Sequence, residues 1–178
     1  MLLSRKLALL AAIAALLPVS ACTVEPLNAS RSNSQLANGN YNSSTVQVLA
    51  AMDVDPVNSR TAQQVRNRLL FALNGGRQQS GGRYRVSLTV KELTKTLSVE
   101  ASGLAPTSAQ VRVRVDYSLI DKQNGSVVAT GQQQSLAAYD RTPQNFSNQR
   151  AERDAQNRAA HEVAEKLRLV IAQNVASL

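Results

Sequence analysis

The sequence contains no tryptophan, one histidine and one cysteine, and only 3% of its residues are aromatic. So few aromatic rings leave few platforms on which sugars or bases could stack, which argues against carbohydrate hydrolysis. A single cysteine cannot form a disulfide within the chain, so a folded domain must be stabilised by its core. One histidine and one cysteine also cannot assemble the usual His/Cys metal site or a Cys-His catalytic pair.

Other catalytic and phosphate-binding patterns are lacking as well. Gly75-Gly76 lacks the Gly-Lys-Ser/Thr ending that would make a phosphate cradle. His161 lies in an amphipathic segment, where we expect it at the border of the apolar stripe with no role assigned. Three acids remain, and nothing in the sequence places two of them together in a cleft: Asp140, Glu152 and Asp154. We therefore predict no enzyme, no cofactor and no metal site.

The only long apolar run, Leu7 to Leu17, is too short for a transmembrane helix, which needs roughly 20 apolar residues. A short basic region precedes it, a pattern typical of an export signal. The run leads to Val19-Ser20-Ala21-Cys22, which resembles a bacterial lipobox. In that motif a cysteine thiolate is the nucleophile that receives a diacylglyceryl group. An ordinary secretory signal is the alternative, but it would leave an unpaired thiol in an oxidising compartment.

We therefore predict a signal peptide over residues 1–21 and lipidation of Cys22, which would anchor the chain to a membrane. Thr23 stands where an inner-membrane retention signal usually places Asp, which favours the outer membrane. Cleavage removes two basic residues and no acidic one, so the formal charge of +8 falls by two. An exported basic chain does not meet nucleic acid. Its acidic partners are phosphate-bearing lipids, lipopolysaccharide and acidic loops of envelope proteins.

The exported chain divides into a polar segment and one domain. Residues 22–44 are rich in Asn and Ser and are predicted to form a flexible tether, and residues 45–178 a single domain. Apolar residues alternate from Thr45 to Val54, which predicts a first strand. Ser59 is then an N-cap for a helix to about Asn74, which Gly75-Gly76 would end.

Three further strands are predicted from alternation. In the first, which starts at Tyr84, the apolar phase moves to Leu93, and we interpret this as a bulge near Lys91 and Glu92. Gln110 to Ile120 is the cleanest strand of the sequence, followed by an Asn-Gly hairpin turn. Residues 126–139 form a more polar strand, which we place at a sheet edge or against a partner.

A long amphipathic helix ends the chain, from Gln149 to about Gln173. The order is therefore β-α-β-β-β-α. This order predicts an α+β fold of two layers, in which both helices pack on one face of a four-stranded mixed sheet.

The opposite face of that sheet would then be open and basic. It would carry Arg85, Lys91, Arg112 and Arg114, with Asp116 as the main acidic group. Like charges on neighbouring strands are mildly destabilising, so their concentration favours an anionic ligand. The plainer interpretation is a solvated basic face.

This combination of motifs resembles the LPS-assembly lipoprotein family, LptE, in its alphaproteobacterial form. The matching pieces cover most of the chain: the lipobox with Cys22 and Pro26-Leu27, Thr61 to Leu73, Val111 to Ile120, Ala138-Tyr139-Asp140 and Ala151 to Ala155. The resemblance implies a non-catalytic lipoprotein that plugs and helps assemble the LptD β-barrel and contacts lipopolysaccharide on its way to the outer leaflet.

Under this interpretation Lys91, Arg112 and Arg114 would bind the phosphates of lipid A through charge-assisted hydrogen bonds. The alternative is a periplasm-facing lipoprotein that binds and activates an envelope enzyme or serves a lipid transporter. A lipoprotein enzyme is a third class, which the scarcity of catalytic residues disfavours.

Overall fold

Three strands of 14 to 16 residues and a 32-residue helix make up most of the described structure, a computed structural model. It describes residues 43–76, 81–99 and 106–178, so the predicted signal peptide, Cys22 and the tether lie outside the described residues. The elements in order are α2 (Ser43–Ala50), β1 (Asp53–Val54), α3 (Arg60–Asn74), β2 (Tyr84–Val99), β3 (Pro106–Asp121), β4 (Val127–Asp140) and α4 (Asn145–Ala176).

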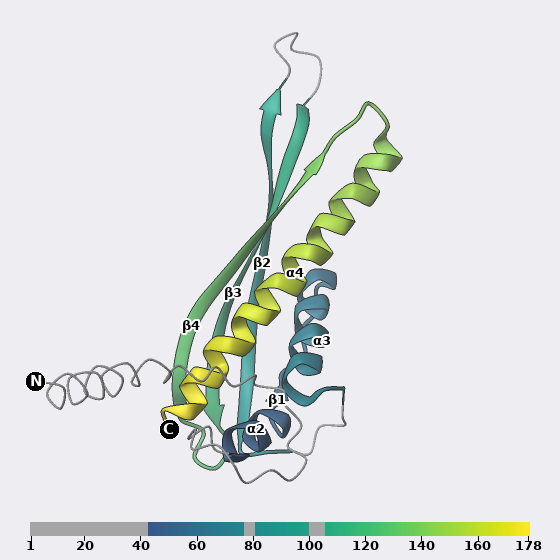
Figure 1. The fold of residues 1–178 in the computed structure, drawn as a ribbon. Helices are drawn as coiled ribbons and strands as arrows, with labels where there is room; N and C mark the ends of the chain where they lie inside the picture. Colours follow the sequence, from purple (N-terminus) through teal and green to yellow (C-terminus); the bar gives the residue numbers. More distant parts are fainter. Residues whose placement is uncertain (1–42, 77–80, 100–105) are drawn as a thin grey trace, which may run out of the picture. The chain divides into compact units, whose positions relative to one another are not determined.

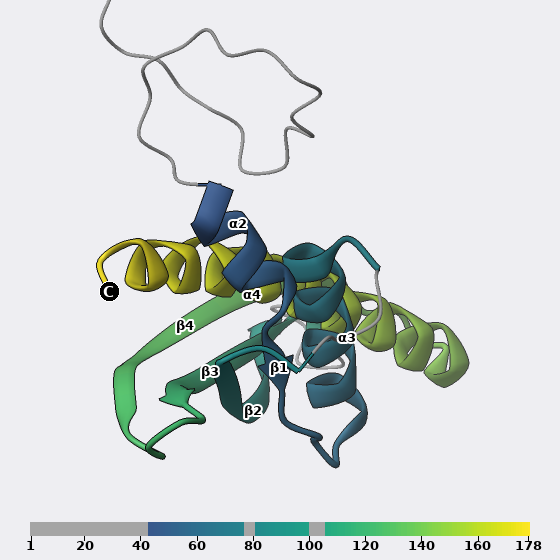
Figure 2. The same ribbon diagram turned by 90° about the horizontal axis from the view of Figure 1, so that it is seen from below.

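The four strands form one mixed sheet in the order β1-β2-β3-β4. β1 is parallel to β2, with α3 as the crossover between them, and the other neighbours are antiparallel. Helices α3 and α4 lie side by side on one side of the strands (Figures 1 and 2). The predicted α+β fold is confirmed, and so is the position of β4 at the sheet edge.

The first predicted strand is wrong over most of its length. Instead of a strand from Thr45 to Val54, the chain forms the helix α2, and only Asp53–Val54 pairs with β2. The helix places Leu49 in the core, and Met52, in the short segment between α2 and β1, follows it there; they are 5% and 1% exposed. The described residues therefore contain one helix more than the two predicted.

Helix α3 begins and ends as its sequence predicts. The backbone N–H of Ala62 donates to the Ser59 hydroxyl oxygen at 3.1 Å, which satisfies one of the free donors of the first turn. At the other end Gly75 has a φ of 66°, a left-handed conformation that glycine adopts without steric cost. Its N–H donates to the carbonyl of Phe71 and closes the last turn.

Helix α4 is longer than predicted and packs on the sheet through small residues in its first half. Leu167 and Ile171 follow further along and are fully buried. Near its end the Asn174 amide donates to the Tyr117 hydroxyl at 2.9 Å. Tyr117 lies across Gly131 of β4, where an added Cβ would come within 2.7 Å of that hydroxyl oxygen. The small residues buried in the first half are Ala155, Ala159, Ala160 and Ala164.

The core lies between the sheet and the two long helices. Alternate residues of β3 point into it, and Val111, Val113 and Val115 have no exposed surface. We call this side of the sheet the helix-covered face and the other side the open face. Residues paired across neighbouring strands share a face, so the register assigns the regularly paired residues of β2, β3 and β4 to one of the two faces.

The predicted bulge near Lys91 and Glu92 is also wrong. The pairing of β2 with β3 is regular from Tyr84 to Thr96, and the irregularity comes only beyond Thr96. Glu92 is paired with Val113 and lies on the helix-covered face, whereas Leu93 is paired with Arg112 on the open face. The change of apolar phase thus reflects a change in what each face contacts, and the strand itself does not break.

Candidate functional site

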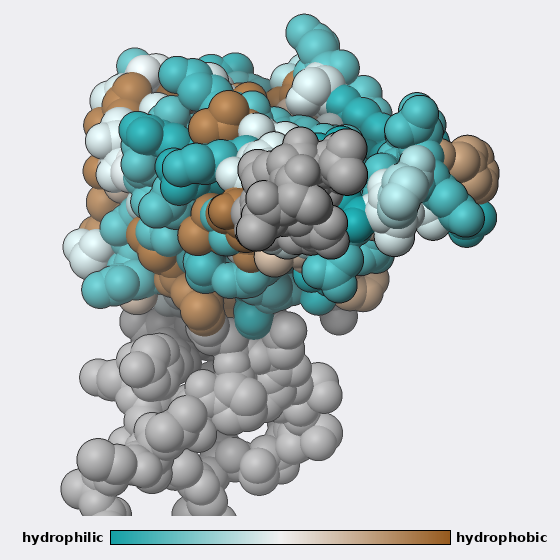
Figure 3. Space-filling view, turned by 90° about the horizontal axis from the view of Figure 1, so that it is seen from above, coloured by the Kyte–Doolittle hydropathy of each residue, from teal (hydrophilic) through white to brown (hydrophobic). Residues whose placement is uncertain are grey.

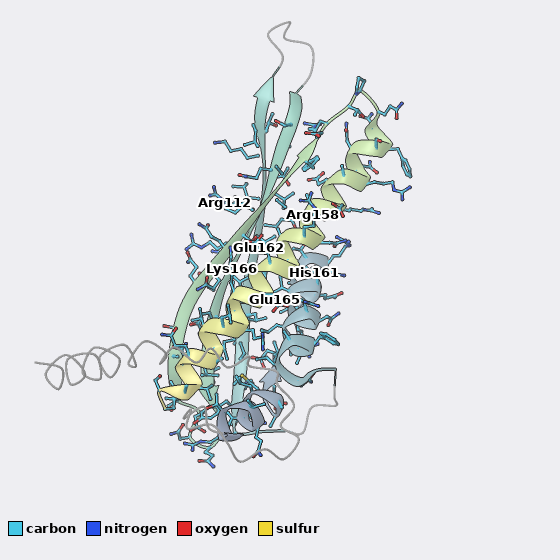
Figure 4. The ribbon with its side chains drawn as sticks, in the orientation of Figure 1. Arg112, Arg158, His161, Glu162, Glu165 and Lys166 are labelled. Atoms are coloured by element: carbon cyan, nitrogen blue, oxygen red, sulfur yellow. The ribbon has the colours of Figure 1, made fainter. Side chains whose placement is uncertain are left out.

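The open face brings together the three residues predicted to bind lipopolysaccharide. Lys91 of β2 pairs directly with Arg114 of β3, and Arg112 lies two residues further along β3 on the same face. Lys95, paired with Gln110, continues the set. We call Lys91, Lys95, Arg112 and Arg114 the cationic cluster. All four are exposed, and Figure 4 shows Arg112 on the side of the strands away from α4.

Little negative charge offsets the cationic cluster. Its one ion pair with another described residue joins Arg114 Nε and Asp116 Oδ1 at 3.7 Å, and the Gln132 amide also donates to that carboxylate at 2.6 Å. Within the described chain, Lys91 and Arg112 have no carboxylate partner. Directly paired like charges repel each other, so this arrangement would be eased by an anion placed between them.

Arg85, the fourth basic residue predicted on this face, lies apart from the cationic cluster. Its Nε is 3.6 Å from Asp55 Oδ1, and it belongs to the end of the sheet at which β1 pairs with β2. Close by, the Lys122 ammonium contacts the Asp53 carboxylate at 2.7 Å. Both basic residues lie at this end of the sheet, away from the cationic cluster, and we therefore do not include them in the site.

Two leucines that the sequence did not point to as site residues flank the cationic cluster. Leu93 and Leu136 lie on either side of Arg112 in one cross-strand row, and they are 58% and 42% exposed. Leu93 could have been placed on the open face from the sequence if residues 84–99 had been interpreted as one unbroken strand. It is an odd number of residues from the buried Val86 and Leu88, so it faces the opposite side of the sheet.

The helix-covered face beside the cationic cluster is polar and internally satisfied. The Glu92 carboxylate accepts from the Thr61 hydroxyl at 2.5 Å and from the Gln156 amide at 2.6 Å. The Thr94 hydroxyl donates to Glu152 at 2.9 Å. These bonds join β2 to α3 and α4, so we interpret them as structural.

The remaining predicted acids and the histidine do not form a site with one another. Asp154 pairs with Arg158 at 2.8 Å on α4, and Glu152 is bound by Thr94. His161 is exposed on α4, as we expected of a residue at the border of the apolar stripe (Figure 4). Among the described residues, no group of three His, Cys, Asp or Glu side chains is placed to hold a metal ion.

A second charged group holds the hairpin end of the sheet. Arg83 Nε and Nη2 donate to Asp121 Oδ2 at 2.9 and 2.7 Å, and the Gln123 N–H donates to Oδ1. The bonds from Arg83, and then that from Gln123, lower the pKa of Asp121. The same pairing raises the pKa of Arg83. Because the Asp121 side chain is only 3% exposed and already paired, it serves the fold and offers no site for a ligand.

The surface around the start of α4 differs from the open face. Seen from that end it is mainly hydrophilic, with hydrophobic residues scattered over it (Figure 3). Phe146 is the most exposed of the large hydrophobic residues found there, and the Arg150 guanidinium lies 5.8 Å from its ring centre.

No helix within the described residues is both long and apolar enough to cross a membrane.

Comparison with protein families identifies the chain. The family described as LptE, lipopolysaccharide-assembly, matches residues 45–169. This match covers most of the chain, and the chain therefore belongs to the LptE family. A search of curated proteins gave no match.

Solved structures of lipoproteins share the fold. A lipoprotein from Caulobacter crescentus is 27% identical over 76% of this chain and 98% of its own, with a TM-score of 0.63. A minor lipoprotein from Acinetobacter baumannii is 18% identical over 69% of this chain and 89% of its own, with a TM-score of 0.54. The rare lipoprotein B from Shewanella oneidensis is 14% identical over 71% and 96%, with a TM-score of 0.55.

Proposed function

We propose that this protein is a non-catalytic lipoprotein of the Gram-negative envelope that binds lipopolysaccharide through the cationic cluster during its assembly. Membership of the LptE family supports the role in lipopolysaccharide assembly. The observation that carries the binding site is the pairing of Lys91 with Arg114 beside Arg112, on an exposed face with little acidic compensation. Two phosphates of one lipid A molecule would offset these charges.

The chemistry of this step requires no bond to be made or broken. Guanidinium groups match phosphate oxygens with two parallel N–H donors, and such charge-assisted bonds are stronger than neutral ones. Arg112 and Arg114 project from the same face of β3, so they could engage one phosphate or two neighbouring ones. In this way the cluster would draw lipid A phosphates away from the divalent cations that hold them in the membrane.

We also propose that the domain lodges in the lumen of an LptD-like outer-membrane β-barrel, anchored beside it by lipid on Cys22. A barrel interior is polar, so a plug should expose uncharged polar and charged groups. The open face of β4 is of this kind, since Gln132 and Gln134 are both exposed there. These glutamines lie on the same open face as the cationic cluster, so we expect this face to meet both the lipid and the barrel interior.

Purification from solubilised outer membranes tests the partner. A tag on the full chain should recover a large β-barrel protein in equal amount. Recovery of a peptidoglycan synthase or an inner-membrane transporter in its place would support the adaptor role instead.

Replacement of Cys22 tests the anchor, and it should abolish lipidation and deplete the complex. A Cys22 variant that is lipidated as before would exclude the predicted anchor.

Binding of lipopolysaccharide by the purified protein tests the site. We expect Arg112→Glu with Arg114→Glu to weaken binding at least about tenfold, because two charge-assisted contacts become repulsive. Arg150→Glu with Arg153→Glu is the matched control, since it makes the same charge change on exposed residues of α4. Equal weakening by both pairs would mean that net charge alone attracts the lipid.

A further inference from the structure

The row Leu93–Arg112–Leu136 runs across three strands of the open face, with the arginine between two exposed leucines. The neighbouring row on one side is Lys91–Arg114–Gln134, and on the other side it is Lys95–Gln110–Ala138. Directly opposite residues on neighbouring strands lie about 5 Å apart, so the two leucines, which are two strands apart, lie about 10 Å from each other and within reach of one lipid molecule.

The composition of this patch narrows the ligand. Single exposed leucines are common on protein surfaces and need no explanation. Here, however, both leucines are paired with the same residue, Arg112, and basic residues occupy the adjoining rows on both sides. An inorganic phosphate or a phosphorylated sugar would use the cations and leave the leucines in water. A phosphorylated amphiphile would place its acidic headgroup on the cations and the start of an acyl chain across the leucines.

We propose that Leu93 and Leu136 form an acyl-chain contact site, so that this face binds phosphate and hydrocarbon of the same lipid molecule. The inference deepens the proposed function and rests on it. It assigns the headgroup to Lys91, Arg112 and Arg114, and it adds an apolar contact that makes the face selective for lipids over water-soluble phosphates. An acidic protein segment, which would need the cations alone, is the competing occupant.

The row also explains why the apolar phase of β2 changes at Leu93. On the helix-covered face the same level is occupied by Glu92, held by Thr61 and Gln156. Leu93 therefore gives no core packing at its own level, and its side chain is more than half exposed. A leucine at this position contributes more to a ligand than to the fold.

The test compares two probes with the mature lipoprotein, kept in one dilute detergent. Diphosphoryl lipid A carries both phosphate and acyl chains, and its fully deacylated disaccharide carries the phosphates alone. We expect Leu93→Asn with Leu136→Asn to weaken binding of lipid A about tenfold, because the affinity gained by burying part of a leucine side chain is lost. The same variant should leave binding of the disaccharide unchanged. Arg112→Gln with Arg114→Gln should weaken binding of both probes.

Leu169→Asn is the matched control, because Leu169 is an exposed leucine of α4 on the other side of the sheet. Unchanged thermal unfolding of each variant would show that the fold is intact. If the double leucine variant binds lipid A as the parent does, the acyl-chain site is excluded while the proposed function stands. If the parent binds neither probe, the proposed function fails together with the inference.

Discussion

The two faces of β3 differ in every respect except the backbone that they share. On the helix-covered face, Val111, Val113 and Val115 have no exposed surface and pack beneath α4. On the open face, Arg112 and Arg114 alternate with them and lie in solvent. One strand thus supplies both the centre of the core and the two arginines of the proposed binding site.

This division separates stability from function. Burial of apolar surface stabilises the fold at about 25 cal/mol per Å², and only the helix-covered face contributes it. Exposed charges contribute little to stability and are screened by salt, so the open face can change its residues at small cost.

The largest effect should come from the covered side. We expect Leu167→Ala to lower the free energy of unfolding by about 2–5 kcal/mol, because the residue is fully buried and its loss leaves a cavity. Leu169→Ala, two residues along the same helix but 54% exposed, should change it by less than about 0.5 kcal/mol. Denaturant unfolding measures both, and equal losses would contradict the distinction.

Acid should act next, through the charged group at the hairpin end of the sheet. The folded pKa of Asp121 is lowered by Arg83, so its contribution to stability is fully present above the unfolded value of about 3.9 and is lost as the pH falls through the folded value. We expect unfolding below about pH 4 to depend less on pH in Asp121→Asn.

Arg83→Gln should reproduce much of that change, and the double variant should add little to either single variant, because the two residues act as one pair. Thermal unfolding at several acidic pH values measures the effect. An additive double variant would show that Asp121 is stabilised mainly by other groups.

The smallest effect should have the opposite sign. Lys91→Glu places an acidic residue directly opposite Arg114 and relieves a cross-strand repulsion, so stability should rise by about 0.2–1 kcal/mol. The same change should weaken binding of lipopolysaccharide. Thr89→Glu, one level along the same face and opposite Asp116, is a control that should not stabilise. A Lys91→Glu variant with lower stability would contradict the view that this face retains its charge for a ligand.

Local signals in the sequence determined much of this protein. Ser59 sets the start of α3 because its side chain accepts a hydrogen bond from a free backbone N–H of the first turn. Gly75 sets its end because glycine adopts the left-handed conformation at no steric cost. The strict alternation around Val113 predicted that Arg112 and Arg114 of β3 share a face, and the alternation that starts at Tyr84 placed Lys91 of β2 on the same side of the sheet. A period of two leaves a strand no other way to bury its valines.

Tertiary contacts decided the rest. The alternation from Thr45 to Val54 suits a strand by pattern, yet β1 pairs over two residues only. The core instead receives Leu49 from α2 and Met52 from the segment between α2 and β1. The exposure of Leu93 on the open face follows from the contacts of its neighbour Glu92 on the helix-covered face, where Thr61 of α3 and Gln156 of α4 donate to the Glu92 carboxylate. Residues so distant in the chain leave no local signal, because their proximity exists only after the helices have packed on the sheet.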